Sequence, residues 1–361
     1  MKRFARMPLW TIAAPVGAWL LLGASTLGLG GWLSIVLTIS LFGSVLAAVH
    51  HAEVVAHKVG EPYGTLVLAV AITVIEVALI VSLMLAGGPS TAALARDTVF
   101  AAVMIILTGM LGLCLLVGAH HHHEQSFGQH GVSASLAALA AIVVLTLVLP
   151  NYTTTVAGPV YSPGQLAFVA VVSLVLYVTF VLVQTIKHRD YFLPEDVGDA
   201  DGDDHADPPS TRVTQLSLAL MLACLGAVVL LGKSLAADIE ALVAGAGAPK
   251  AVVGVIIAAV VLMPESLAAL RAARANRLQT SLNLALGSAL ASIGLTIPAV
   301  AIVSLATGWT LTLGIDLKST VLLVLTLIVA TLSLGTGRTT VLQGVVHLVI
   351  FAVYLFTTIV P

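Results

Sequence analysis

Two glutamates are the residues of this sequence best placed to do chemistry. Glu76 lies near the middle of the run Leu66 to Leu85, LVLAVAITVIEVALIVSLML, where it is the only ionisable residue. Glu265 lies about half a chain later, in the run VIIAAVVLMPES. A carboxylate inside such a run is costly in a bilayer and is usually functional. We expect Glu76 and Glu265 to face each other across one cation site.

The chemistry of two such carboxylates indicates ion exchange. Ca²⁺ prefers oxygen ligands, carboxylates first and then carbonyls and water. Two buried carboxylates also repel each other when both are charged, which raises the proton affinity of the pair. One Ca²⁺ or two protons can neutralise them, so cation and proton compete. The alternative is that each glutamate only hydrogen-bonds a neighbouring helix.

Neighbouring residues on the same segments can add oxygen ligands. Pro264 has no N–H, so a carbonyl one turn earlier, near Val260 and Val261, is left free to bind a cation or simply to mark a kink. Thr73 lies one turn before Glu76 and can place a hydroxyl on the same face.

A stripe of hydroxyls runs along another expected helix. Ser288, Ser292 and Thr296 recur at steps of four, so they share one face. They can supply further ligands or a hydrated path beside Glu265, or they can allow close packing of helices through small residues. Thr108 is the expected counterpart in the first half of the chain.

The composition is that of a polytopic α-helical membrane protein. Hydrophobic residues make up 59% and charged residues 9% of the 361 positions, and the mean hydropathy is +1.09. Eleven apolar runs are long enough to span a bilayer. Their expected limits are 10–29, 31–50, 65–86, 97–118, 134–150, 164–186, 212–232, 251–271, 283–305, 319–335 and 339–360.

One long polar segment, residues 187–211, divides the chain. It leaves one helix plus five before it and five after it. An odd number of helices per unit makes the second unit run in the opposite sense to the first, as in many transporters with inverted repeats. We therefore expect an all-α membrane fold with helices 2–6 and 7–11 as repeats. The expected domains are an extra N-terminal transmembrane helix (1–30), a first repeat (31–186), an acidic cytoplasmic linker (187–211) and a second repeat (212–361).

The basic residues predict the orientation in the membrane, because Lys and Arg accumulate in cytoplasmic loops. With the N-terminus inside, the outer loops hold only Arg96, Lys233, Lys250 and Lys318, and all other Lys and Arg fall on the cytoplasmic side. The C-terminus is then outside. Glu61, at the cytoplasmic entry to the third helix, is a candidate vestibule carboxylate.

Other polar clusters allow two interpretations each. His120 to His123 are expected in a cytoplasmic loop, either solvated or sensing metal, and His347 either relays protons or is a packed core histidine. The acidic linker contains Asp199-Ala-Asp201-Gly-Asp203, but it lacks the glycine and the glutamate of an EF-hand. A solvated linker is the simpler interpretation.

The segments around the two glutamates resemble the cation/Ca²⁺ exchanger superfamily, in its calcium/proton exchanger branch and its bacterial ChaA-type sodium–calcium/proton antiporters. The resemblance is carried by HHAEVVAHKVGEPYGTLVLAVAITVIEVALI, RDTVFAAVMIILTG, LTLVLPNYT and VLMPESLAALRAARANRLQTSLNLALGSALASIGLTIPAV. It implies an eleven-helix fold with inverted repeats, in which Glu76 and Glu265 bind cation and proton in alternation. The exchangers commonly write GNATE or GNAAE at the repeat, whereas ITVI and VLMP precede the glutamates here. Na⁺ or K⁺ therefore remains an alternative cargo.

These features predict an antiporter of the bacterial inner membrane that exports Ca²⁺ in exchange for protons. It is not expected to be an enzyme or to carry a cofactor, and its partners are membrane lipid and the transported ions. A cation channel would need a continuous polar pore, and a hydrolase would need a nucleophile or a metal motif such as HExxH, which is not present. The chain has no basic stripe for nucleic acid. A homo-oligomer is left open.

Overall fold

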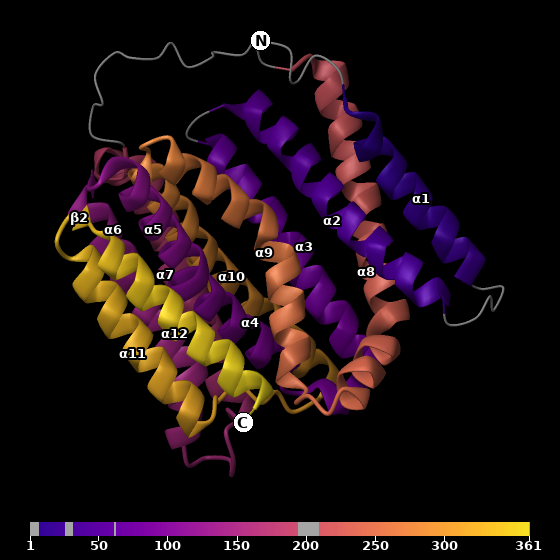
Figure 1. Ribbon diagram of the computed structural model, residues 1–361. Helices are drawn as coiled ribbons and strands as arrows, with labels where there is room; N and C mark the ends of the chain where they lie inside the picture. The colour runs from indigo at the N-terminus through magenta and orange to yellow at the C-terminus, as the bar shows by residue number, and fades with distance from the viewer. Residues whose placement is uncertain (1–6, 26–31, 61–62, 194–208, 361) are drawn as a thin grey trace. The chain divides into compact units, whose positions relative to one another are not determined.

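The computed structural model describes residues 7–25, 32–60, 63–193 and 209–360. These residues are almost entirely helical (Figure 1). Ten helical spans among them are long and apolar enough to cross a membrane. The shorter apolar helix α1, Leu9–Ser25, precedes them. Glu61 and the linker carboxylates from Glu195 to Asp207 lie outside the described residues.

The α-helices follow one another along the chain. They are α1 (Leu9–Ser25), α2 (Trp32–Val59), α3 (Tyr63–Gly87), α4 (Leu94–Met104), α5 (Leu111–His122), α6 (Gln129–Val143), α7 (Pro163–Leu182), α8 (Thr211–Gly245), α9 (Ala251–Arg274), α10 (Leu278–Thr307), α11 (Leu317–Leu334) and α12 (Val341–Ile359). The 3₁₀ and π segments are η1 (Gly88–Thr91), η2 (Ile105–Met110), η3 (Val144–Val148), η4 (Leu149–Tyr152), η5 (Val183–Lys187) and η6 (Arg189–Phe192).

Several helices are longer than the apolar runs that predicted them. The helix expected at 31–50 extends to Val59, and the one expected at 212–232 extends to Gly245. His120 to His122 form the last turn of α5, so the prediction that they lie in a loop is wrong. Polarity alone does not end a helix, because the cost of an ordinary polar residue in a helix is below about 1 kcal/mol when no Gly or Pro intervenes. Gly60, with φ 77°, follows the end of α2, and Gly247, with φ 68°, follows the end of α8.

The chain folds into two compact units. One comprises the described residues of Met1–Gly87 and Val197–Leu242, and the other those of Gly88–Asp196 and Val243–Pro361. Each unit thus combines segments from both halves of the sequence. The expected repeats at 31–186 and 212–361 concern symmetry along the chain, and their boundaries stay a prediction.

In the first unit, α1 packs against α2 and α2 packs against α3. Polar groups join α8 to its neighbours. The indole Nε1 of Trp19 donates to the carbonyl oxygen of Ala223 at 3.1 Å, and the hydroxyl of Ser82 on α3 donates to that of Val229 at 2.8 Å. These bonds satisfy donors that lipid could not serve.

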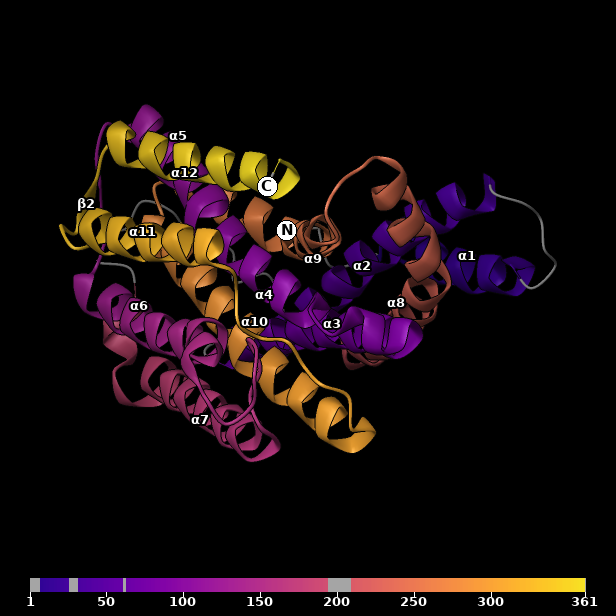
Figure 2. The same cartoon turned by 90° about the horizontal axis from the view of Figure 1, so that it is seen from below.

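In the second unit, the span Leu94–His122 (α4, η2 and α5) is central. Of an apolar stretch of 18 residues in this span 89% is buried, against 22% of such a stretch in Val341–Ile359. It packs against α9, α10 and α12. Both views show α11 beside α12, and Figure 2 shows α10 running along α7.

A small two-stranded sheet closes one end of this unit. Strand β1, Gln125–Ser126, pairs antiparallel with β2, Arg338–Thr339. The amide Nε2 of Gln125 donates to the carbonyl oxygen of Ala273 at 2.9 Å and to Asn276 Oδ1 at 3.0 Å. The side chain of Gln125 in β1 therefore links the segment after α5 to the C-terminal end of α9.

Candidate cation and proton site

Glu265 lies in α9, which runs unbroken from Ala251 to Arg274. Its side chain is only 6% exposed, and the hydroxyl of Ser288 on α10 donates to Oε2. A buried carboxylate requires such a donor, because it would otherwise lose the hydrogen bonds that water gives it. The structure thus brings together two residues that the sequence placed on separate helices.

The hydroxyl stripe of α10 continues beyond Ser288. Ser292 and Thr296 are also buried. Within the described residues, the hydroxyl of Thr296 has no hydrogen-bond partner. A buried oxygen of this kind is available to a ligand or to water. The stripe can therefore extend the oxygen-rich surface next to Glu265.

Pro264 directly precedes this glutamate inside α9. It has no N–H to donate to the carbonyl of Val260, four residues earlier. Because α9 remains one helix through this position, the proline does not divide it into two half-helices. The proline leaves one backbone oxygen without its helical donor, one turn from the carboxylate.

Thr108 lies in the π segment η2, Ile105–Met110, and is fully buried. Its hydroxyl donates to the carbonyl of Met104 in the preceding turn. The π segment packs against α9 and α10, the helices that carry Glu265 and Ser288. Single π turns inside α-helices are frequent at functional sites. Periodicity could not reveal this one, because the run RDTVFAAVMIILTG reads as an uninterrupted helix.

Glu76 lies in α3 of the other unit and is 2% exposed. The hydroxyl of Thr73 donates to the carbonyl oxygen of Ala69 in its own helix, at 2.9 Å. Thr73 can therefore offer Glu76 or a cation only its oxygen lone pairs. On the next turn, Leu79 approaches Gly232 of α8 so closely that a Cβ there would lie 2.5 Å from Leu79 Cδ1.

The two glutamates thus belong to different compact units, and each is described within its own. That they share one ion stays a prediction from the sequence. Within the described part of the chain no three His, Cys, Asp or Glu side chains gather into a metal-binding group. Beside Glu265 the structure places the hydroxyl of Ser288, and oxygen ligands of this kind suit hard cations such as Ca²⁺ and Na⁺.

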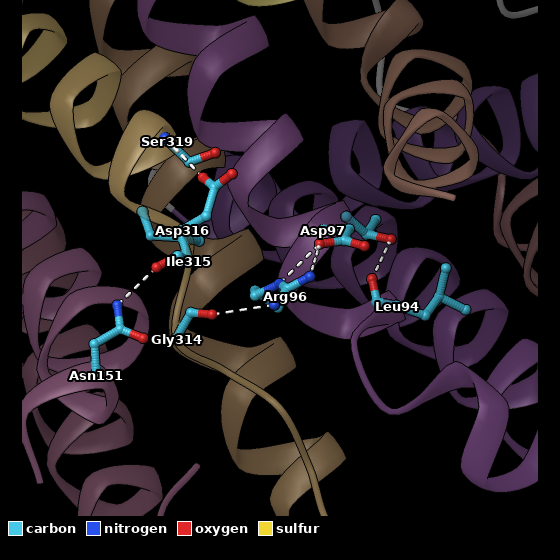
Figure 3. A network of polar contacts seen from close by, with 9 residues as sticks. Leu94, Arg96, Asp97, Asn151, Gly314, Ile315, Asp316 and Ser319 are labelled. Carbon is cyan, nitrogen blue, oxygen red and sulfur yellow. Dashed lines mark hydrogen bonds and ion pairs between the residues drawn. The ribbon is translucent and has the colours of Figure 1, made fainter. Parts of the chain in front are cut away.

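A second polar network lies at the start of α4 and of α11 (Figure 3). Arg96 pairs with Asp97 at 2.8 Å and donates from Nη1 to the carbonyl oxygen of Gly314 at 3.1 Å. Asn151 donates to the carbonyl oxygen of Ile315 at 2.7 Å. These bonds fasten the connection between α10 and α11 to two other segments of the unit.

Asp316 caps α11 within this network by accepting a bond from the N–H of Ser319 at 2.8 Å. Partial burial acts to raise the pKa of Asp316, but the bonds from Ser319 and the charges of Lys318 and Arg96 outweigh it and hold the pKa below its ordinary value. Most of this network joins residues far apart in the sequence, and no local pattern predicts it. Asp316 three residues before Ser319, at the start of an apolar run, was the signal available.

Comparison with known proteins identifies the class of protein. The chain belongs to the sodium/calcium exchanger protein family, which matches residues 29–186 and 216–360. Its membership of the cation/Ca²⁺ exchanger superfamily, predicted from the glutamate segments, is confirmed.

Two relatives are similar over most of their length. The chain is 47% identical over 367 residues to the putative ionic transporter y4hA of Sinorhizobium fredii (strain NBRC 101917 / NGR234), covering 99% of this chain and 98% of that protein. It is 36% identical over 320 residues to the sodium-potassium/proton antiporter ChaA of Escherichia coli (strain K12), covering 88% and 86%.

Solved exchangers share the fold. Native YfkE matches with a TM-score of 0.72 at 17% identity, over 98% of this chain and 100% of that one. The H⁺/Ca²⁺ exchanger CAX matches with a TM-score of 0.70 at 15% identity, over 96% and 87%. The predicted all-α membrane fold with inverted repeats is thereby confirmed. The roles of the individual site residues stay predictions.

Proposed function

We propose that this protein is a secondary antiporter that exports Ca²⁺ in exchange for protons by alternating access, with Glu76 and Glu265 binding cation and proton competitively. One observation carries the proposal: in a chain of the exchanger family, both mid-span carboxylates are almost fully buried. Burial makes an ionised carboxylate costly, which favours binding of a proton or a cation at each glutamate.

The surroundings of Glu265 support this competition. The hydroxyl of Ser288 stabilises the ionised carboxylate, because a bond to a charged acceptor is stronger than one to a neutral group. When a proton occupies the carboxyl group, its bond with Ser288 weakens and its affinity for a cation is lost. Export of one ion and import of the other then use the same oxygen atoms.

The test is proton release from acid-loaded everted vesicles on addition of CaCl₂. Wild type should respond, whereas Glu76→Gln and Glu265→Gln should each lower the rate by at least about a hundredfold. Removing one partner of a buried charge pair costs about 3 kcal/mol, which corresponds to a rate change of that size. Glu124→Gln is the matched control, because Glu124 is exposed and its contact with Arg338 is a loose 3.6 Å. Undiminished exchange in both membrane variants would contradict the proposal.

Exchange of Na⁺ or K⁺ for protons is the second candidate. It is supported by the relative from Escherichia coli, which is described as a sodium-potassium/proton antiporter. The same vesicles with NaCl or KCl decide between the cargoes. A response to these salts alone would keep the glutamate mechanism and replace Ca²⁺ as its substrate.

The proposed location is the bacterial inner membrane, with the N-terminus in the cytoplasm and the C-terminus outside. The distribution of Lys and Arg supports this orientation. Cysteine labelling with an impermeant reagent would test it. Arg338 and Lys250 are both exposed. Arg338→Cys should react with the reagent from the cytoplasmic side, and Lys250→Cys should react from the outer side.

A further inference from the structure

His347 is a fully buried histidine of α12 whose two ring nitrogens both make hydrogen bonds. Nδ1 lies 2.7 Å from the carbonyl oxygen of Leu107, and Nε2 lies 2.8 Å from the hydroxyl of Ser333 on α11. A carbonyl oxygen can only accept, so Nδ1 must carry a proton and donate it. The proposed exchange of ions does not by itself require this residue.

His347 donates to the carbonyl oxygen of Leu107, which lies in the π segment η2, Ile105–Met110. The π turn deprives this carbonyl of its α-helical donor. In an α-helix the N–H of Leu111 would donate to Leu107, four residues earlier. Here that N–H donates to the carbonyl of Ile106 instead, five residues earlier. The shift leaves the carbonyl of Leu107 without its usual donor, and the imidazole supplies one from another helix.

Glycines bring α12 close enough to make this bond. A Cβ on Gly112 would lie 3.0 Å from His347 Cβ, and one on Gly109 would lie 3.2 Å from the ring of Phe351. A larger residue at either position would push α12 away from the span Leu94–His122. The bond from His347 to the carbonyl of Leu107 therefore depends on the close approach that these glycines allow.

We propose that His347 is a positioning residue of the exchanger, which holds the π turn in place through the bond from Nδ1 to the carbonyl of Leu107. The π turn carries Thr108 and packs against the helices of Glu265 and Ser288. If the turn reverted to regular α-helix, the residues before or after it would rotate relative to α9. The part played in transport rests on the proposed function, whereas the effect on the π turn does not.

Two substitutions of similar size separate the two ring nitrogens. The amide nitrogen of asparagine can occupy the position of Nδ1, and that of glutamine the position of Nε2. His347→Asn should therefore keep the donor to Leu107, and His347→Gln should lose it. Ser333→Ala is a further control, because it removes only the contact at Nε2.

The first readout is hydrogen exchange of the backbone amides of residues 105–112 in the purified full chain. His347→Gln should speed their exchange by about fivefold or more, since an element that loses a buried contact opens more often. His347→Asn and Ser333→Ala should stay close to wild type. This measurement is independent of whether the protein exchanges Ca²⁺.

The second readout is cation-driven proton release in vesicles, with the maximal rate and the half-saturating cation concentration measured separately. His347→Gln should raise the half-saturating concentration about tenfold, and His347→Asn should restore it to within about threefold of wild type, a tenfold change being ~1.4 kcal/mol. The proposal is overturned if His347→Gln matches wild type in both readouts, or if His347→Asn is as impaired as His347→Gln. Absence of exchange in wild type would instead count against the proposed function.

Discussion

The helices that carry the two glutamates differ in how they are built and held, although the sequence aligns them without gaps. Val67 to Glu76 in α3 corresponds to Ile256 to Glu265 in α9. Before its glutamate α3 has Ile75, whereas α9 has Pro264. Thr73 bonds its own helix, whereas Glu265 receives a hydroxyl from a second helix. The hydroxyls predicted beside the two carboxylates therefore donate to different kinds of acceptor.

The two helices also meet their neighbours through different contacts. In the first unit, Gly232 of α8 faces the flexible end of Leu79 on α3. In the second, Gly254 of α9 lies against the backbone of Asp97 and Thr98, where an added Cβ would come within 2.7 Å of the Asp97 carbonyl carbon. An added methyl group on α9 would meet backbone, which cannot change rotamer, whereas one at Gly232 would meet a side chain that can.

Substituting the residue directly before each glutamate should produce the largest difference between α3 and α9. Ile75→Pro removes an N–H from the interior of α3 and should destabilise the protein by about 3 kcal/mol. Pro264→Ala restores the N–H in α9 and should raise the thermal unfolding temperature in detergent. We expect the same Pro264→Ala change to slow cation-driven proton release, because the carbonyl of Val260 would then be bonded within the helix.

Pro264→Gly is the control for this pair, since it restores the N–H without favouring the helix as alanine does. Wild-type exchange in Pro264→Ala would remove the carbonyl from the proposed set of ligands. Pro264 would then only mark a kink or a tolerated break in the hydrogen bonding of α9.

The glycine contacts should give the next largest difference. Gly254→Ala places a methyl group against backbone and should cost about 2 kcal/mol, within the range for overpacking. Gly232→Ala should cost about 1 kcal/mol or less, because the Leu79 side chain can change rotamer. Thermal unfolding of the two variants in the same detergent checks the comparison. Equal losses would contradict the expectation that backbone adapts to an added methyl group less readily than the Leu79 side chain does.

The extent to which the sequence predicted these features follows from the range of each interaction. Apolar runs and isolated carboxylates are local signals, so the sequence predicts the spans and places both glutamates inside them. The bond from Ser288 to Glu265 depends on the packing of α9 against α10, and only the shared hydroxyl stripe indicated it. The π turn at Ile105–Met110 and the bond from His347 to Leu107 depend on contacts with a distant helix. No local periodicity encodes them. The polarity of His120 to His122 likewise predicts a loop, whereas α5 continues through His122.

The smallest difference should come from the hydroxyls beside the two glutamates. Ser288→Ala removes a donor to a buried carboxylate, so cation affinity should fall about tenfold, the lower end of the loss for a bond to a charged group. Thr73→Val should change affinity by less than about threefold, because the threonine donates its proton to the carbonyl of Ala69 and so does not stabilise an ionised Glu76 as Ser288 does Glu265. Half-saturating cation concentrations in the vesicle assay, measured at one pH, compare the two directly. A larger loss in Thr73→Val would show that the threonine lone pairs bind the ion, and that hydroxyl oxygens support both glutamates after all.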